Sequence, residues 1–284
     1  MTSIFRPTGT AQVYLIGKCM DTLIHLLNIP YYYSNIDNHL LNKNTISIRW
    51  FIIFFDKNGK SLYEHETEIK EGASAIISIK KIFKQNGLNY DGFGQFVVKH
   101  NAQQKFHCNF YTSYIQDGKN NLNRVFRLHS HQKINLSSNN MTERLKRTIK
   151  NILYVLRIKN FYRYSSAISS WNRYDLEGKY IYLLIANHGN SKMGLRIDLR
   201  GRNINKKLIT LNTIKANAPE FGASIVKLID YSESNQIKPD QRLEIRLNGI
   251  GTLSRKPIII MTDREVVTSG NCINSLSILH MQHI

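Results

Sequence analysis

Alternating polar and apolar positions dominate the first half of the chain. The segment Thr45–Phe55 is rich in β-branched and aromatic residues, which is typical of a strand buried on both faces or at the centre of a sheet. An Asp-Lys-Asn-Gly turn follows at residues 56–59, since Asn-Gly favours the positive φ of a tight turn. Ser61–Ile69 then alternates, and predicts the second strand of a β-hairpin. One side of that strand is acidic and carries Glu64, Glu66 and Glu68.

Further short apolar or alternating runs, separated by turn residues, predict strands in both halves of the chain. Short strands with turns between them indicate an all-β sandwich or barrel. Lys80–Gln85 is expected to be a short helix or an irregular stretch, and Asn248–Gly251 a loop. The tail after Asp263 has no strand or helix period. The predicted strands are Ala75–Ile79, Gln95–Lys99, Lys105–Tyr114, Arg124–His131, Lys179–Ala186, Met193–Leu199, Lys207–Ile214, Ser224–Ile229, Arg242–Leu247 and Pro257–Met261.

The region between the halves has a helical period. Asn140 and Glu143 have the spacing of a capping box. Apolar residues then recur on one helical face, and basic residues fill most of the remaining positions. The pattern predicts a basic amphipathic helix. Its apolar residues are Leu145, Ile149, Ile152, Leu153 and Leu156, and its basic residues are Arg144, Lys146, Arg147, Lys150, Arg157, Lys159 and Arg163.

The chain length favours two domains, because 284 residues correspond to roughly two units of typical size. We predict an all-β protein with two immunoglobulin-like antiparallel β-sandwich domains joined by a helix-containing linker. The first domain spans 1–135, the basic helical linker 136–175, and the second domain, with its poorly defined tail, 176–284. A triplet, Gly72-Ala73-Ser74, recurs as Gly222-Ala223-Ser224 before a predicted strand, which hints at a repeat.

The formal net charge is +19, from 39 Lys and Arg against 20 Asp and Glu. Such a charge suits an anionic partner, but the richness in Asn, Ile, Lys and Tyr also fits an AT-rich coding bias. The three cysteines are far apart, which favours a reducing compartment. With no apolar run long enough to cross a bilayer and no signal peptide, we expect a cytoplasmic protein.

An apolar strand at Ile48–Phe55 leads through an Asp/Gly turn to a polar strand at Leu62–Ile69. A turn and strand at Gly72–Ile79 and a short strand at Phe96–His100 follow. This order resembles the small β-sandwich domain of the sensory-rhodopsin-transducer-like family, over about residues 30–115 and more faintly over 178–264. The resemblance implies an immunoglobulin-like, non-enzymatic domain with signalling partners and with carbohydrate or nucleic acid as ligand. No functional residue is carried over.

Three surfaces could carry a function. Tyr/Asn-rich strand faces suit stacking on a sugar, with Tyr31, Tyr32, Tyr33, Tyr111 and Asn109 as candidate ligand-binding residues. The basic helix suits an anionic polymer such as nucleic acid, or a membrane surface, through Arg144, Lys146, Arg147, Lys150 and Arg157. Three histidines on adjoining predicted strands, His107, His129 and His131, suit a metal ion, although no carboxylate follows the His-Ser-His pair.

The leading hypothesis is a non-catalytic binding or accessory protein whose ligand is a carbohydrate or a protein partner. Binding of an anionic polymer through the basic helix is the alternative, and a metal-dependent β-barrel enzyme is the second alternative. We predict no cofactor. The alternating glutamates are interpreted as a solvated strand face that discourages edge pairing, not as a catalytic carboxylate pair.

Overall fold

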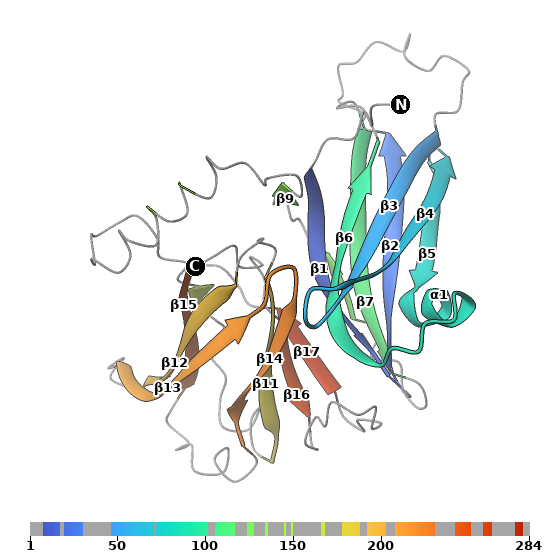
Figure 1. Cartoon of the computed structure of the whole chain (residues 1–284). Helices are drawn as coiled ribbons and strands as arrows, with labels where there is room; N and C mark the ends of the chain where they lie inside the picture. The colour runs from blue at the N-terminus through green and yellow to red at the C-terminus, as the bar shows by residue number, and fades with distance from the viewer. Residues whose placement is uncertain are drawn as a thin grey trace, which may run out of the picture.

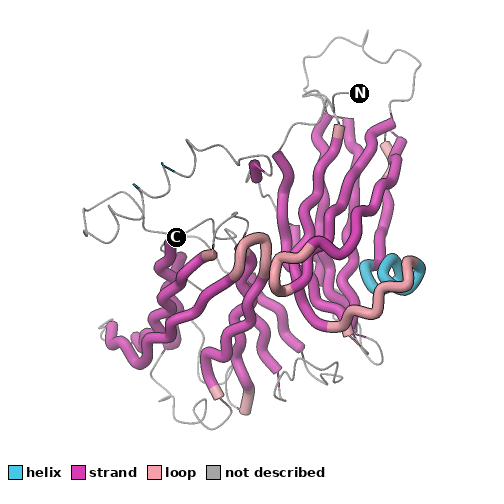
Figure 2. Tube along the Cα trace, viewed as in Figure 1, coloured by secondary structure: helices cyan, strands magenta, loops and turns pink. Residues whose placement is uncertain are grey.

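Strands make up nearly all of the regular structure, and α1 (Ile79–Gln85) is the one helix whose residues are all described (Figures 1 and 2). No described helix is long and apolar enough to cross a bilayer. The computed structural model describes residues 8–17, 20–30, 47–70, 72–101, 106–116, 124–127, 134–135, 145, 149, 166–167, 178–187, 192–202, 208–230, 242–250, 258–262 and 276–280.

Two antiparallel sheets form the first half, with strand orders β4-β3-β6-β1-β9 and β5-β2-β7-β8. Turn chemistry fixes the β3–β4 hairpin, because the Asp56 carboxylate accepts hydrogen bonds from the backbone N–H of Asn58 and Lys60. The strands are β1 (Thr8–Ile16), β2 (Met20–Pro30), β3 (Ser47–Asp56), β4 (Ser61–Lys70), β5 (Ser74–Ser78), β6 (Gly92–His100), β7 (Phe106–Gln116), β8 (Arg124–Arg127) and β9 (Ile134–Asn135).

Two further antiparallel sheets form the second half, with strand orders β10-β15-β12-β13 and β14-β11-β16-β17. The short strand β10 lies within the segment that the sequence assigns to the linker, and it pairs with β15. The strands are β10 (Ser166–Ala167), β11 (Tyr180–Ala186), β12 (Met193–Arg202), β13 (Leu208–Ala218), β14 (Ala223–Ile229), β15 (Arg242–Ile250), β16 (Ile258–Thr262) and β17 (Leu276–His280).

The two halves share one strand order. When β1–β8 are matched in sequence with β10–β17, β4-β3-β6-β1 corresponds to β13-β12-β15-β10, and β5-β2-β7-β8 corresponds to β14-β11-β16-β17. The repeated Gly-Ala-Ser triplets lie at matching positions, before β5 and at the start of β14. The second half therefore repeats the topology of the first, and its described residues contain no counterpart of α1 or β9.

A buried asparagine occupies the same place in each half. The side chain of Asn28, at the end of β2, donates to the carbonyl of Ile69 over 3.0 Å. The side chain of Asn187, just after β11, donates to the carbonyl of Ala218 over 3.2 Å. Each asparagine also bonds through its backbone to the turn before the next edge strand, at Gly72 and Gly222 respectively. These amides fix the same corner of both halves.

Each half has an apolar core between its two sheets. In β12, Leu195, Ile197 and Leu199 are buried while Arg196 is exposed, so only one face of the strand enters the core. The first core includes Tyr14, Ile24, Leu26, Trp50, Ile52, Phe54, Phe83, Phe96 and Phe110. The second includes Ile181, Leu183, Ile185, Leu195, Ile197, Leu199, Leu228, Ile245 and Ile259.

A third apolar cluster joins the halves. On β1, Tyr14 faces the first core, whereas Val13 and Leu15 face the second half. On β11, odd-numbered residues face the second core and even-numbered residues face the first half. Four sheets are thus stacked with three apolar layers between them. The third cluster contains Val13, Leu15, Met20, Phe93, Tyr114, Tyr182, Leu184, Ala186, Ala223 and Ile260.

The β3–β4 turn contacts the β13–β14 turn beside this cluster (Figures 1 and 2). The backbone N–H of Ala223 donates to the carbonyl of Lys57 over 3.1 Å. The rings of Phe55 and Phe221 stack with centroids 5.7 Å apart, and Phe221 has a φ of 49°. Since a positive φ is costly for a non-glycine residue, the stacked ring and the turn hold that conformation in place.

Several expectations from the sequence need correction. The tail after Asp263 is not structureless, because Leu276–His280 pairs with β16. Asn248–Ile250 is strand, not loop, since it continues the pairing of β15 with β12. β3 lies inside its sheet, but its burial alternates and Arg49 is exposed. Ile79 begins α1 instead of ending a strand. The strands β1 and β2 were not expected.

Glycine at position 59 is required by the contact between the two turns. Its φ is +85°, and a Cβ there would collide with the carbonyl of Glu220. Gly87 has a similar φ of +67° but open space around it. We expect Gly87→Ala to cost about 1–2 kcal/mol of unfolding free energy from backbone conformation alone. Gly59→Ala should cost an additional ~1–3 kcal/mol from overpacking. Urea unfolding of both variants measures the difference, and equal losses would contradict the tight turn contact.

Candidate binding surfaces

The predicted Tyr/Asn surface lies on the outer face of the sheet β5-β2-β7-β8. Tyr111 is opposite His25 on β2 and Arg127 on β8, and Ile76 on β5 is opposite His25 on the other side. Tyr111 is half-buried, and Asn109 occupies the next position on the same side of β7. Ile76 is 65% exposed. The structure thus places Tyr111 and Asn109 on one strand side, whereas Tyr31, Tyr32 and Tyr33 lie outside the described residues.

The centre of this face holds a polar pair. Nε2 of His25 lies 2.7 Å from Oγ of Ser113. Burial lowers the pKa of His25, so its ring is neutral near pH 7. The face therefore offers an exposed isoleucine, a tyrosine and a neutral histidine, with Arg127 at the neighbouring register position of β8.

The predicted metal site is not assembled by the described residues. His107 lies on β7, whereas His129 and His131 lie outside the described residues. Within the described ranges, no three His, Cys, Asp or Glu residues are close enough to hold a metal ion. Of the three predicted metal ligands, the structure therefore places only His107.

The acidic side of β4 is solvated, as the sequence predicts. Glu64, Glu66 and Glu68 are exposed. Arg49 on β3 forms ion pairs with Glu66 at 3.8 Å and with Glu68 at 3.9 Å. All three side chains are more than half exposed, so these pairs contribute little to stability.

The basic helix is described at two residues only. Leu145 and Ile149 are both helical, and they are 62% and 49% exposed. A connector helix packed on a sandwich would bury its apolar face, so these two exposures contradict that arrangement for Leu145 and Ile149. The candidate polyanion-binding residues Arg144, Lys146, Arg147, Lys150 and Arg157 lie outside the described residues.

A second basic surface lies on the outer face of the sheet β10-β15-β12-β13, opposite its core side. Arg196, Asp198 and Arg200 alternate there with the buried leucines and isoleucine of β12. Lys215 of β13 pairs with Arg196, and Arg246 of β15 pairs with Asp198. The basic residues at outward register positions, called the basic face below, are Arg196, Arg200, Arg202, Lys215, Arg242 and Arg246; the acidic ones are Asp198 and Glu244.

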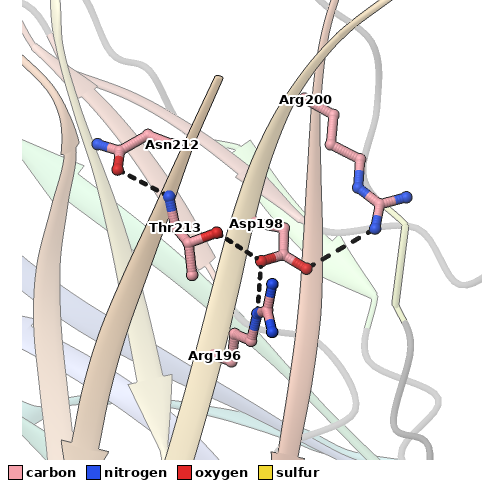
Figure 3. A network of polar contacts seen from close by, with 5 residues as sticks. All are labelled: Arg196, Asp198, Arg200, Asn212 and Thr213. Carbon is pink, nitrogen blue, oxygen red and sulfur yellow. Dashed lines mark hydrogen bonds and ion pairs between the residues drawn. The ribbon is translucent and has the colours of Figure 1, made fainter. Parts of the chain in front are cut away.

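Asp198 organises the centre of the basic face (Figure 3). Its Oδ1 accepts hydrogen bonds from Nε of Arg196 at 2.8 Å and from the hydroxyl of Thr213 at 3.0 Å. Its Oδ2 lies 3.7 Å from a terminal nitrogen of Arg200. Burial alone would raise the pKa of Asp198, but these hydrogen bonds and the two arginine charges outweigh burial and lower it. Asp198 is therefore ionised and holds both arginines on one side of the sheet.

None of the surfaces expected from the sequence includes the basic face. Its signal is present in the sequence, because Leu195, Ile197 and Leu199 alternate with charged residues in β12. The same alternation recurs in β15. Only the sheet register shows that the two charged rows are neighbours, since it pairs residues almost 50 positions apart, such as Asp198 and Arg246.

Comparison with known proteins gives no family. No protein-family model matches the chain, and no curated protein is similar to it in sequence. The resemblance to sensory-rhodopsin-transducer-like domains therefore stays a prediction, and function has to be inferred from the residues and their geometry.

The lowered pKa of Asp198 predicts a pH-dependent contribution to stability. A carboxylate with a lowered pKa stabilises the fold above its unfolded pKa of about 3.9, and the stabilisation is lost as the pH falls through the lower folded value. We expect Asp198→Asn to reduce the unfolding free energy by about 1–2 kcal/mol at pH 7 and by progressively less below about pH 4.

Asp230→Asn is the control for this measurement. Asp230 forms an exposed ion pair with Lys227 at 3.2 Å, and such pairs contribute about 0–1 kcal/mol. Chemical unfolding at several pH values compares both variants with the parent protein. An Asp198→Asn effect of constant size across the acidic range would contradict the assigned ionisation.

Proposed function

We propose that the protein is a non-catalytic binding protein that associates with an anionic membrane surface through its basic amphipathic segment, residues 144–163. The observation that carries the proposal is the exposure of Leu145 and Ile149, one helical turn apart, within the most basic stretch of the chain. Helices that lie in a membrane interface combine such an apolar side with lysines and arginines around it.

The charge distribution supports a lipid surface as the partner. Seven basic residues and no acidic residue occupy positions 144–163, and the whole chain carries +19. Each cation near an anionic bilayer contributes about 1 kcal/mol. Exposed leucine and isoleucine side chains favour lipid over nucleic acid here, because apolar insertion adds to charge attraction at a bilayer.

Binding of a carbohydrate or a protein partner through the outer face of β5-β2-β7-β8 is the second candidate. The row Ile76, His25 and Tyr111 supports it, because it combines an exposed apolar side chain with a ring and a neutral polar group. A contact of this kind depends little on salt, whereas membrane association through the basic segment depends strongly on salt.

Vesicle co-sedimentation tests the proposed function. Wild-type protein should bind vesicles of phosphatidylcholine with phosphatidylserine and should not bind pure phosphatidylcholine. Neutralising Lys146, Arg147 and Lys150 to Gln should weaken binding on the order of 100-fold, from about 1 kcal/mol per charge. The double variant Leu145→Asp and Ile149→Asp should also lose binding, because it removes the apolar contact and adds repulsion from the lipid.

Leu211→Asp is the matched control, since Leu211 is a leucine of β13 that is 47% exposed and lies far along the chain. It should bind vesicles as the parent protein does. Vesicle binding that survives both the triple neutralisation and the double Asp variant would overturn the proposal.

A further inference from the structure

The sheet topology does not by itself require charged residues on the basic face. Its counterpart in the first half is the outer face of β4-β3-β6-β1, because the two sheets have the same strand order. That counterpart is apolar where it is covered by the second half, with Val13, Leu15, Phe93 and Val97 buried. In the second half, the outward side chains of β12 and β13 are exposed instead, with Arg196 59% exposed and Lys215 exposed.

The central rows of the basic face contain only polar or charged residues. Reading across β13, β12 and β15, the rows are Lys215–Arg196–Asn248, Thr213–Asp198–Arg246 and Thr210–Arg200–Glu244. Positions in such rows are about 4.8 Å apart across the strands and about 6.7 Å apart along them. The four basic residues of these rows, Lys215, Arg196, Arg246 and Arg200, therefore occupy neighbouring positions on one side of the sheet.

Two features prepare this array for an anionic group. Asp198 holds the guanidinium groups of Arg196 and Arg200 against the sheet, which reduces the side-chain entropy lost on binding. The Nε of Arg200 is buried and finds no hydrogen-bond partner among the described residues. A buried donor of this kind is rare in proteins and is commonly met by a bound water or ion. Arginine forms paired hydrogen bonds with phosphate oxygens, which a point charge does not.

We propose that the basic face binds nucleic acid through its phosphate groups, independently of base sequence. The all-polar rows offer no apolar side chain for insertion into a bilayer, which favours a phosphate chain over a membrane. The same rows offer no aromatic ring on which a base could stack, so charge and hydrogen bonds to phosphate carry the contact. The basic face lies on β12, β13 and β15, away in sequence from the basic segment at residues 144–163. The inference is therefore separate from the membrane association proposed for that segment.

Fluorescence anisotropy with a labelled single-stranded RNA of mixed sequence tests the proposal on the full chain. The logarithm of the binding constant should fall linearly with the logarithm of the salt concentration. The double variant Arg196→Gln and Arg200→Gln should bind at least about tenfold more weakly, and its salt slope should fall by about 1.4, since each lost single-strand phosphate contact removes ~0.7. A second RNA of different sequence should bind equally well.

Three further variants make the result decisive. Lys81→Gln with Lys84→Gln removes the same charge from exposed positions on α1, and should leave RNA affinity within about twofold. Lys215→Gln, on the basic face but outside the Asp198 contacts, should weaken RNA binding without disturbing those contacts. Leu145→Asp with Ile149→Asp should lose vesicle binding and retain RNA binding, which separates the two proposals.

Two outcomes would overturn the inference. One is RNA affinity that changes no more in the Arg196/Arg200 and Lys215 variants than in the α1 control. That result would mean that RNA binding depends on the total charge of the protein and not on the basic face. The other is normal RNA binding with lost vesicle binding in the Arg196/Arg200 variant, which would assign the basic face to lipid.

Discussion

The fold depends on apolar contact between one face of β1 and β6 and one face of β11. Val13, Leu15 and Phe93 from the first half contact Tyr182 and Leu184 from the second. Because β1, β6 and β11 are buried on both faces, removing one half would expose apolar surface on the other. The buried hydrogen bond from the Gln95 side chain to the carbonyl of Asn187 fixes the orientation of the halves. The two halves are therefore joined by both an apolar cluster and a buried hydrogen bond.

Stacking two halves of the same topology leaves one sheet face open at each end. The open face of the first half carries Ile76, Tyr111 and the His25–Ser113 pair. The open face of the second half carries Arg196, Arg200 and Lys215. The outward side of β1 and β6 is thus apolar at the junction, whereas the outward side of β12 and β13 is charged at the open end. The side chains, and not the topology, therefore determine which sheet faces pack against the other half and which stay exposed to solvent.

The sequence predicts strands where polar and apolar residues alternate, as in β4 and β12, but not where both faces mix the two. In β2, Thr22 and Asn28 point inward and bond to the backbone at Leu15 and Ile69, while Leu23 and Leu27 lie on the other side. The period-2 signal cancels in such a strand. The acidic side of β4 follows from its alternating sequence, and the charged residues of β12 alternate in the same way. Which rows become neighbours follows only from long-range register.

Native-state hydrogen exchange tests the shared core most directly. Phe55→Ala removes the ring that stacks on Phe221, and Phe55 belongs to a small cluster with Val97 and not to the second core. If the halves unfold as one body, this variant lowers the opening free energy of the amides of β11 and β14 by the same amount as those of β3 and β6. A loss of protection confined to β3 and β6, with unchanged exchange in β11 and β14, would contradict the account.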